Sequence, residues 1–467
     1  MTHDRRWLAL TVLCLGVLMI VLDTTIVNVA LPSVQQDLGF SAASLAWVVN
    51  AYMLTFGGFL LLGGRLGDLY GHRRLFLMGL ALFTAASLAC GLAQTQAMLI
   101  AARAVQGLGA AVVTAVALSL IMDLFTDTAD RSKAMGVYGF VCAGGGSIGV
   151  LLGGVLTGTF DWHWVFLVNV PIGILVYALS LRLLPDGHGT ASDHPLDLGG
   201  ATTVTGGMLL AVYAVVNGNE AGWTSITTLG LLGAAAMVLA AFLVIESRVA
   251  APLMPLGLFR LRSVAVSSVV GMLWSAAMFS WFFLSALYMQ LVLGYTPMQI
   301  GLAFLPANLI MAAFSLGWSA KLVMRYGLRA PLAVGLAFAA AGLVLFAQAP
   351  VQGEFVAHVL PGMLLLGLGC GVAFNPVLMA AMSEVGPGDS GLASGVVNTS
   401  FMLGGALGLA VLASIAQARN AALTAAGADT LAALAGGYGA AFLVGAGFAA
   451  FAAMLGAVLL PASAHRH

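Results

Sequence analysis

The sequence has few charged residues: Asp, Glu, Lys and Arg make up only 7% of its 467 residues, whereas 61% are hydrophobic. Soluble globular domains carry about 25% charged residues, and they need them to cover a surface that faces water. The composition therefore excludes a water-soluble fold. It points to a chain that lies in a lipid bilayer.

The sequence also has no excess of charge of either sign. It contains 17 Lys and Arg against 17 Asp and Glu. No strongly basic or acidic tail stands out, and such a tail is what would indicate a nucleic-acid partner. We therefore predict no nucleic-acid partner.

Residues for metal binding and catalysis are scarce as well. The four cysteines, Cys14, Cys90, Cys142 and Cys370, lie in apolar runs at spacings that fit neither a disulfide framework nor a zinc site. The 8 histidines show no metal-ligand spacing, and no G-x-S-x-G elbow or phosphate-binding loop is present. We expect no metal, no cofactor and no enzyme activity, so any uphill transport must use an ion gradient.

Long apolar runs dominate the chain, and about 20 such residues are enough to cross the hydrocarbon core of a membrane. Fourteen runs of this kind are predicted to be membrane-spanning helices: 8–29, 45–64, 75–94, 97–122, 134–157, 164–184, 199–217, 225–246, 263–289, 298–318, 330–349, 356–383, 393–416 and 436–460. Cytoplasmic loops retain Lys and Arg. With both termini in the cytoplasm, all 17 of these residues except Arg103 and Arg419 fall on the cytoplasmic side or at its boundary.

An internal repeat divides the chain. Tyr70-Gly71-His72-Arg73 recurs 256 residues later as Tyr326-Gly327-Leu328-Arg329, and such repeats are typical of transporters built from two related bundles. We expect an all-α membrane protein with a six-helix bundle in 1–184, a second six-helix bundle in 263–467, and two inserted helices in 185–262.

Two charged residues fall inside predicted spans, where charge is costly and usually functional. Asp23 lies in the first span and Arg103 in the fourth, and both are expected in the outer half of the membrane. If they meet, the carboxyl group can change its protonation when its partner or hydration changes. The alternative is a static charge pair that fixes the two helices together.

The loop between the second and third spans combines glycines with charges: Gly64, Asp68, Gly71, Arg73 and Arg74. An Asp among cations can hold helix ends together and release them when the bundles rock, so we predict a cytoplasmic gate. The alternative is a simple positive-inside anchor. In the fifth span, Gly145, Gly149, Gly153 and Gly154 are predicted to allow close helix packing.

Neutral polar and aromatic side chains within the spans are candidates for a substrate cavity. They are Asn28, Asn50, Gln106, Asn308, Asn375 and Asn398, together with Trp274, Trp281, Phe282, Phe283 and Tyr288. For any one of them, contact between helices or with lipid is the alternative role.

Several of these segments resemble one known family over nearly the whole chain. Leu22-Asp23-Thr24-Thr25-Ile26-Val27-Asn28-Val29-Ala30-Leu31-Pro32, Gly64 to Arg74, Arg103-Ala104-Val105-Gln106-Gly107, Asn169-Val170-Pro171-Ile172-Gly173 and Gly294-Tyr295-Thr296-Pro297 are similar to motifs of the major facilitator superfamily. The resemblance is strongest to its fourteen-span drug:proton antiporters, and the inserted pair of helices agrees with it.

The resemblance implies that Asp23 is the protonation site, Arg103 its modulator, and Asp68 with Arg73 the gate. It implies proton-driven export of amphipathic drugs, antibiotics or dyes by alternating access. Abundant Ala and Gly are compatible with a bacterial source, so we expect a monomer in a bacterial cytoplasmic membrane. Val150 stands where a proline usually follows the glycine of the fifth-span motif. A lipid or metabolite transporter of either direction therefore stays open, as does a membrane sensor that transports nothing.

Overall fold

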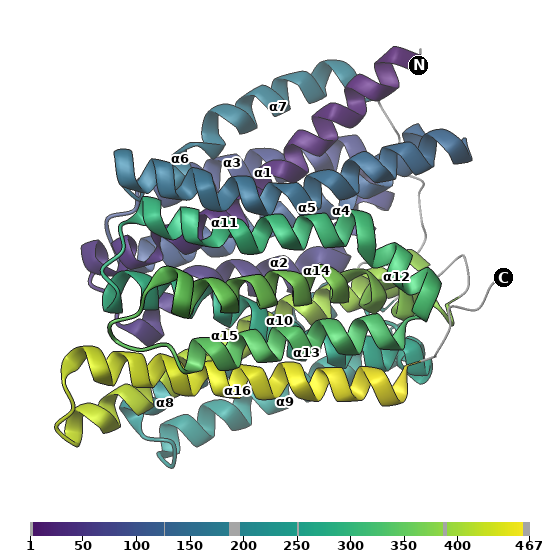
Figure 1. Ribbon diagram of the computed structural model, residues 1–467. Coiled ribbons are helices and arrows are strands. Elements are labelled where there is room, and N and C mark those ends of the chain that lie inside the picture. The colour runs from purple at the N-terminus through teal and green to yellow at the C-terminus, as the bar shows by residue number, and fades with distance from the viewer. Residues whose placement is uncertain (1–2, 126, 186–196, 250–251, 386–389, 461–467) are drawn as a thin grey trace.

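The computed structural model describes residues 3–125, 127–185, 197–249, 252–385 and 390–460, and every regular element in these ranges is a helix (Figure 1). The helices are α1 (His3–Leu38), α2 (Ala42–Tyr70), α3 (His72–Gly91), α4 (Gln96–Leu124), α5 (Thr128–Thr159), α6 (Trp164–Leu167), α7 (Asn169–Leu183), α8 (Leu198–Ala221), α9 (Ile226–Arg248), α10 (Arg262–Leu287), α11 (Pro297–Ala313), α12 (Ser319–Tyr326), α13 (Arg329–Ala347), α14 (Leu360–Met382), α15 (Ser390–Ala425) and α16 (Thr430–Leu459). Short turns of tighter or wider helix, η1 (Leu256–Arg260), η2 (Tyr288–Val292), η3 (Phe314–Trp318) and η4 (Phe355–Val359), adjoin α10, α11 and α14.

The described helices are long enough for a membrane protein with many crossings. Twelve helical segments in the described residues have the length and apolar composition to span a bilayer. The two other predicted spans fall on α5 and on α11 with η3, where the apolar stretches found, Ile148–Thr159 and Pro297–Ala313, are shorter. The all-helical prediction is confirmed, and the count of fourteen spans stays a prediction.

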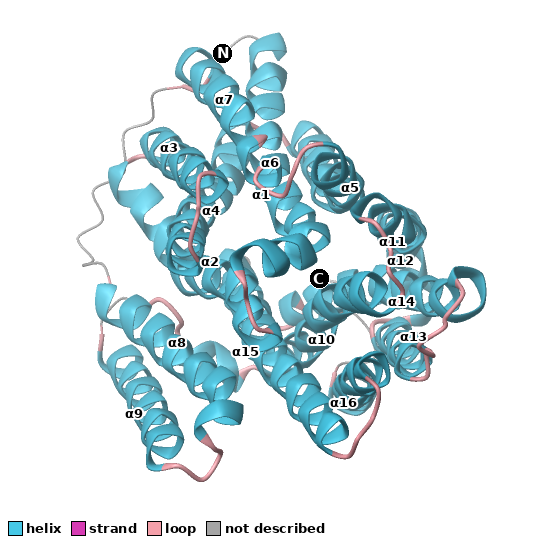
Figure 2. Ribbon diagram, turned by 90° about the vertical axis from the view of Figure 1, so that its left-hand side faces the viewer, coloured by secondary structure: helices cyan, strands magenta, loops and turns pink. Residues whose placement is uncertain are grey.

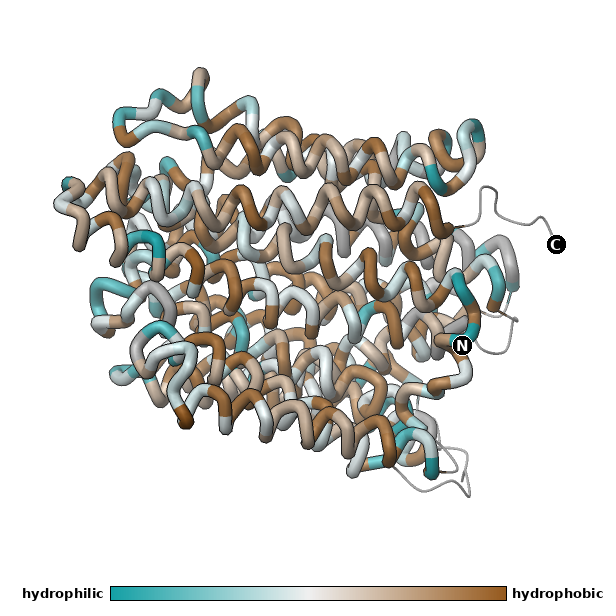
Figure 3. The backbone as a smooth tube through the Cα atoms, turned by 90° about the horizontal axis from the view of Figure 1, so that it is seen from below, coloured by the Kyte–Doolittle hydropathy of each residue, from teal (hydrophilic) through white to brown (hydrophobic). Residues whose placement is uncertain are grey.

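Hydropathy follows the direction of the helices. Hydrophobic residues cover most of their length, and the hydrophilic segments gather toward their two ends (Figure 3). The start of α1 and the end of α16 lie at the same end of the molecule (Figure 1). An apolar layer between two polar ends is the arrangement that a bilayer requires.

Helices of the first part of the chain pack mainly on one another, and so do those of the last part. In the first part α4 packs on α2 and α3, and α1 on α5; in the last part α10 packs on α15, and α13 on α14 and α16. The two parts meet where α5 contacts α11 and where α2 contacts α15. The hairpin of α8 and α9 lies at the edge of the molecule, beside α2 and α15 (Figure 2).

Glycines allow the closest of these contacts. A side chain at Gly153 would lie 2.7 Å from the carbonyl oxygen of Ile26, and Gly145 and Gly149 face α1 in the same way. Gly154 instead faces Gly301 of α11, and a Cβ on Gly154 would lie 3.3 Å from the Cα of Gly301. The glycine-rich face of α5 therefore packs on α1, and its neighbouring face packs on the other part of the chain.

The repeated loop motif has the same local structure in both places. Gly71 ends α2 with φ +90°, and Gly327 ends α12 with φ +76°. Only glycine adopts such angles without strain. The arginine two residues later binds the end of a later helix in each case: Arg73 Nη2 donates to the carbonyl of Leu181 at 2.7 Å, and Arg329 Nε donates to the carbonyl of Leu460.

Candidate functional site

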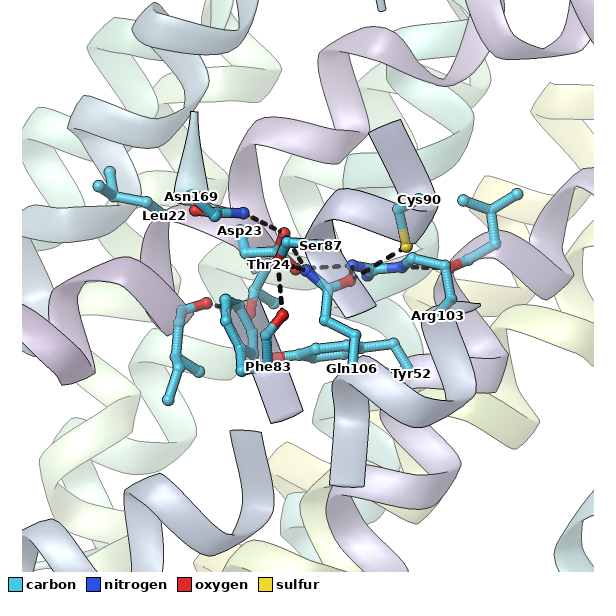
Figure 4. A network of polar contacts seen from close by, with 12 residues as sticks. Leu22, Asp23, Thr24, Tyr52, Phe83, Ser87, Cys90, Arg103, Gln106 and Asn169 are labelled. Carbon is cyan, nitrogen blue, oxygen red and sulfur yellow. Dashed lines mark hydrogen bonds and ion pairs between the residues drawn. The ribbon is translucent and has the colours of Figure 1, made fainter. Parts of the chain in front are cut away.

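The side chain of Asp23 lies just past the middle of α1 and is 0% exposed. Its Oδ2 accepts a hydrogen bond from Nη1 of Arg103 on α4 at 2.6 Å, and the Arg103 side chain is 1% exposed. The two charges that the sequence placed in separate spans therefore form a buried ion pair (Figure 4). A short contact of this kind between charged groups is stronger than a neutral hydrogen bond.

Helix α2 holds the guanidinium of Arg103 from a second side. The Nε of Arg103 donates to the carbonyl oxygen of Val48 at 2.9 Å, and the Cζ of Arg103 lies 4.3 Å from the centre of the Tyr52 ring. A cation over an aromatic face is attracted by the ring quadrupole. Arg103 is therefore fixed by three helices, α1, α2 and α4, before any substrate is present.

Two amide side chains complete the coordination of the Asp23 carboxylate. Gln106 Nε2 donates to Oδ1 at 2.8 Å, and Asn169 Nδ2 at the start of α7 donates to the same oxygen at 2.9 Å. Gln106 also donates to Ser87 Oγ at 2.8 Å and accepts from Arg103 Nη1 at 2.6 Å. Arg103 and Gln106 are one turn apart on α4, so both side chains reach the same point.

The network balances one negative charge with one positive charge in a place that water does not reach. Each carboxylate oxygen accepts from at least one N–H donor. If Asp23 takes up a proton, Arg103 still has two acceptors, the carbonyl of Val48 and Oε1 of Gln106. Protonation of Asp23 would thus leave the guanidinium hydrogen-bonded but without a balancing negative charge.

The network contains residues that the sequence did not assign to it. Gln106 was predicted to line a cavity, but it binds Asp23. Asn169 and Ser87 were not predicted as site residues at all, although Asn169 belongs to one of the family-like motifs. The signal for it was the position of an amide at the entry to the sixth span, two residues before Pro171.

The loop residues of the predicted gate lie where α2 gives way to α3. Gly64 is near the end of α2, Gly71 joins the two helices, and Arg74 is exposed. Arg73 binds the end of α7, within the first part of the chain. The side chain of Asp68 lies outside the described residues, so its predicted contact with the cations stays a prediction.

The predicted cavity residues are spread over both parts of the chain. Several donate to backbone carbonyls. Asn28 Nδ2 donates to Thr24 and Asn308 Nδ2 to Phe304 within their own helices, whereas Asn375 Nδ2 donates to Ser315 and the Tyr288 hydroxyl to Pro350 in other segments. Trp281 and Phe282 pack with Phe304, and Trp281 also packs with Phe346. Phe283 is 0% exposed, and Asn398 is half-buried on α15.

Two of these residues keep polar atoms with no described nitrogen or oxygen partner. Asn50 on α2 is 0% exposed, and neither its Nδ2 nor its Oδ1 has a hydrogen-bond partner among the described residues. Trp274 on α10 is 2% exposed, its Nε1 has no nitrogen or oxygen partner among the described residues and lies near the thiol of Cys370, and its ring meets Phe374 and Phe401 edge-on. Within the described ranges, no group of three or more His, Cys, Asp and Glu side chains is placed to hold a metal ion.

Comparison with known sequences points to one family. The sequence profile of the Major Facilitator Superfamily matches residues 13–409. The Puromycin resistance protein pur8 of Streptomyces alboniger is 41% identical over 423 residues, which are 90% of this chain and 84% of that protein. The Cephamycin export protein CmcT of Amycolatopsis lactamdurans is 42% identical over 410 residues, 87% of this chain and 84% of that protein.

Solved transporter structures share the arrangement of helices. A bacterial homolog of the human lysosomal transporter Spinster, in an inward-facing and occupied conformation, superimposes with a TM-score of 0.71 and 14% identity over 98% of this chain and 97% of that one. The POT family transporter PepTSo gives a TM-score of 0.70 and 16% identity over 98% of both chains. At these identities the likeness concerns the fold alone.

Proposed function

Because the chain belongs to the Major Facilitator Superfamily, whose members are membrane transporters and not enzymes, we propose that it exports amphipathic antibiotics or drugs in exchange for protons. The observation that carries the proposal is the fully buried Asp23, with its charge partner and two amide donors. The names of the similar proteins, a puromycin resistance protein and a cephamycin export protein, support drugs as the substrate class.

In the proposed cycle the proton is carried on an oxygen of Asp23. In the ionised state the carboxylate ties α1 to α4 and α7 through Arg103, Gln106 and Asn169. Protonation removes the charge that holds Arg103 and turns one acceptor oxygen into a donor. The ties between the helices then weaken, so the access of the site can change from one side of the membrane to the other.

We further propose that the bundles 1–184 and 263–467 rock about this site, with the hairpin of 185–262 beside them. Both termini would lie in the cytoplasm of a bacterium, and the monomer would be the working unit. Of the predicted cavity residues, Asn50 has the strongest support as a substrate contact, because both polar atoms of its buried amide lack a partner among the described residues. Trp274, buried near the Cys370 thiol, is a further candidate. Gly64, Asp68, Gly71, Arg73 and Arg74 would form the cytoplasmic gate.

Reconstituted protein tests the proposal directly. Liposomes with an acidic lumen should accumulate puromycin through the wild-type protein, and the Asp23→Asn variant should lose this uphill uptake. A matched control is Asp37→Asn on the same helix, since Asp37 is exposed and its contact, an N–H from Trp162 Nε1 at 2.9 Å, is one that an asparagine oxygen can also accept.

Exchange of labelled puromycin without a pH gradient shows whether Asp23→Asn is folded. Retained exchange with lost accumulation is the expected result. Accumulation that persists in Asp23→Asn would show that coupling lies elsewhere. Substrate-linked proton movement with lipids or metabolites, and none with drugs, would favour the lipid or metabolite transporter instead.

A further inference from the structure

A pair of buried acids lies far from Asp23 in the chain, in the hairpin of α8 and α9. Asp197 precedes the first residue of α8 and is 5% exposed, and Glu246 lies in the last turn of α9 and is 3% exposed. Because α8 and α9 pack on one another as a hairpin, the start of one lies beside the end of the other. The two side chains are in contact.

One oxygen of each carboxyl group has a backbone donor. Asp197 Oδ1 caps α8 by accepting from the N–H of Gly200 at 2.7 Å, and Glu246 Oε2 accepts from the N–H of Met254 at 3.0 Å. The other two oxygens, Asp197 Oδ2 and Glu246 Oε1, are buried and have no donor among the described residues. Both face the same point, because a Cβ on Gly200 would clash with each of them.

No cationic side chain that the structure describes balances the pair. The charged residues on the elements that surround it are Arg65 and Asp68 of α2, Glu220 of α8, Arg248 of α9, Arg260 of η1, Arg262 of α10 and Arg419 of α15. Asp186, His188, Asp193 and His194 lie outside the described residues. Among the side chains that the structure describes, none forms an ion pair or hydrogen bond to the two free oxygens.

Two acceptor oxygens that face each other in a buried site can both be satisfied by a single proton between them. We infer that Asp197 and Glu246 bind one proton, so that one carboxylic acid donates to the other carboxylate. Two touching carboxylates cannot both stay ionised at such a place. A hard cation would need about six oxygen ligands, whereas this site offers two free ones. This inference does not depend on the proposed drug export.

The proton would stabilise the contact between the hairpin of α8 and α9 and the segment at Met254 that leads to the last part of the chain. Met254, which Glu246 holds, follows Leu253, and Leu253 is packed between Leu62 of α2 and Ala201 of α8. Loss of the proton places two negative charges in contact, and the backbone contact at Met254 weakens. We call the contacts of Asp197, Glu246 and Met254 the clasp. It joins α8, α9 and the start of the segment that leads to α10, and it depends on the shared proton.

Amide variants separate a shared proton from two independent acids. In Glu246→Gln the amide oxygen accepts from Met254 and the amide N–H donates to Asp197, so the clasp stays closed without a titrating proton. Asp197→Asn does the same from the other side. In the double variant two NH2 groups face each other, and the clasp opens.

Hydrogen exchange of the Met254 amide in the full-length protein in nanodiscs is the measurement. Corrected for intrinsic rates, protection should fall as pH rises in the wild type, should stay constant in each single variant, and should drop about tenfold or more in the double variant. Glu384→Gln is the matched control, because Glu384 accepts the N–H of Ser263 at 2.9 Å but is exposed and unpaired.

Infrared difference spectra provide a second readout that does not depend on exchange. A protonated carboxyl band that is present in the wild type and in Glu384→Gln and absent in both single variants supports the shared proton. If the band persists in Glu246→Gln and Asp197→Asn, or if the double variant protects Met254 as well as the single ones, the inference is wrong. Asp23→Asn should leave the clasp unchanged, so this result is separate from the transport test.

Discussion

The burial of Asp23 and Arg103 predicts different consequences for the removal of each. Arg103 stays charged when Asp23 is replaced, whereas Asp23 can bind a proton when Arg103 is replaced. In Asp23→Asn, Arg103 keeps its charge, because a guanidinium does not lose its proton in a protein. In Arg103→Met, Asp23 can neutralise itself by binding a proton. The stability of one variant should therefore depend on pH, and that of the other should not.

The magnitude follows from the burial and the contacts. Both side chains are at most 1% exposed, and removal of one partner of a buried pair costs about 3–5 kcal/mol. Protonating an ordinary aspartate at pH 7 costs about 4 kcal/mol, and about 1.4 kcal/mol less for each unit by which the pH falls. The free-energy cost of Arg103→Met should thus shrink by about 2.7 kcal/mol between pH 7 and pH 5.

The double variant Asp23→Asn, Arg103→Met tests the coupling. It leaves no unbalanced charge, and Gln106 and Asn169 can still donate to the amide oxygen at position 23. We expect it to cost less than the more harmful single variant. Unfolding by sodium dodecyl sulfate in mixed micelles can be followed with a thiol-reactive dye, because Cys14, Cys90 and Cys370 are buried.

Asp37→Asn, measured at both pH values, corrects for the pH response of the rest of the protein. A cost of Arg103→Met that is equal at pH 7 and pH 5 would refute the reasoning, since Asp23 would then not be taking up the proton. Additive costs in the double variant would show that the two side chains do not stabilise each other.

Two further substitutions test the surroundings of the pair. In Asn169→Ala the Asp23 carboxylate loses one N–H donor, worth about 1.5–3 kcal/mol, so the pH of half-maximal efflux should rise by about one to two units. Ser87→Ala, whose side chain does not touch Asp23, should leave this pH unchanged. In Gly107→Ala the new methyl group would overlap the carbonyl oxygen of Tyr52 and the hydroxyl of Thr55. This should destabilise the protein by about 1–3 kcal/mol in the same unfolding assay, whereas Gly206→Ala, with nothing within 4 Å of the added atom, should not.

Composition and run length predict the membrane-spanning character of the chain because the bilayer constrains both directly. The predicted runs 75–94 and 164–184 correspond to α3 and to α6 with α7, which end within a few residues of the predicted bounds. The meeting of Asp23 and Arg103 was also predictable, since both are charged and both were expected at similar depth. Depth follows from counting residues along a helix.

Rotation and tilt of the helices do not follow from run length, and three side chains show this. Gln106 turns toward Asp23 because it lies one turn from Arg103, but the sequence alone does not say which face of α4 meets α1. Asn169 reaches the same oxygen from α7, 146 residues away in the chain. Trp281, a predicted cavity residue, packs against Phe304 and Phe346, and the sequence does not reveal such a contact because aromatic side chains suit both a cavity and a packed core.

The internal repeat makes the position of the charges informative. The offset of 256 carries Asp23 to Phe279 and Arg103 to Val359. The loop arginines keep their role at the same offset, since Arg73 and Arg329 both bind the end of a later helix. The two halves therefore share the arginine that binds the end of a later helix, but they do not share the charge pair. If the two halves rock as proposed, protonation acts on the first half alone. The equivalent place in the second half is apolar, which suits the lipophilic part of a substrate and argues against a dication as the preferred cargo.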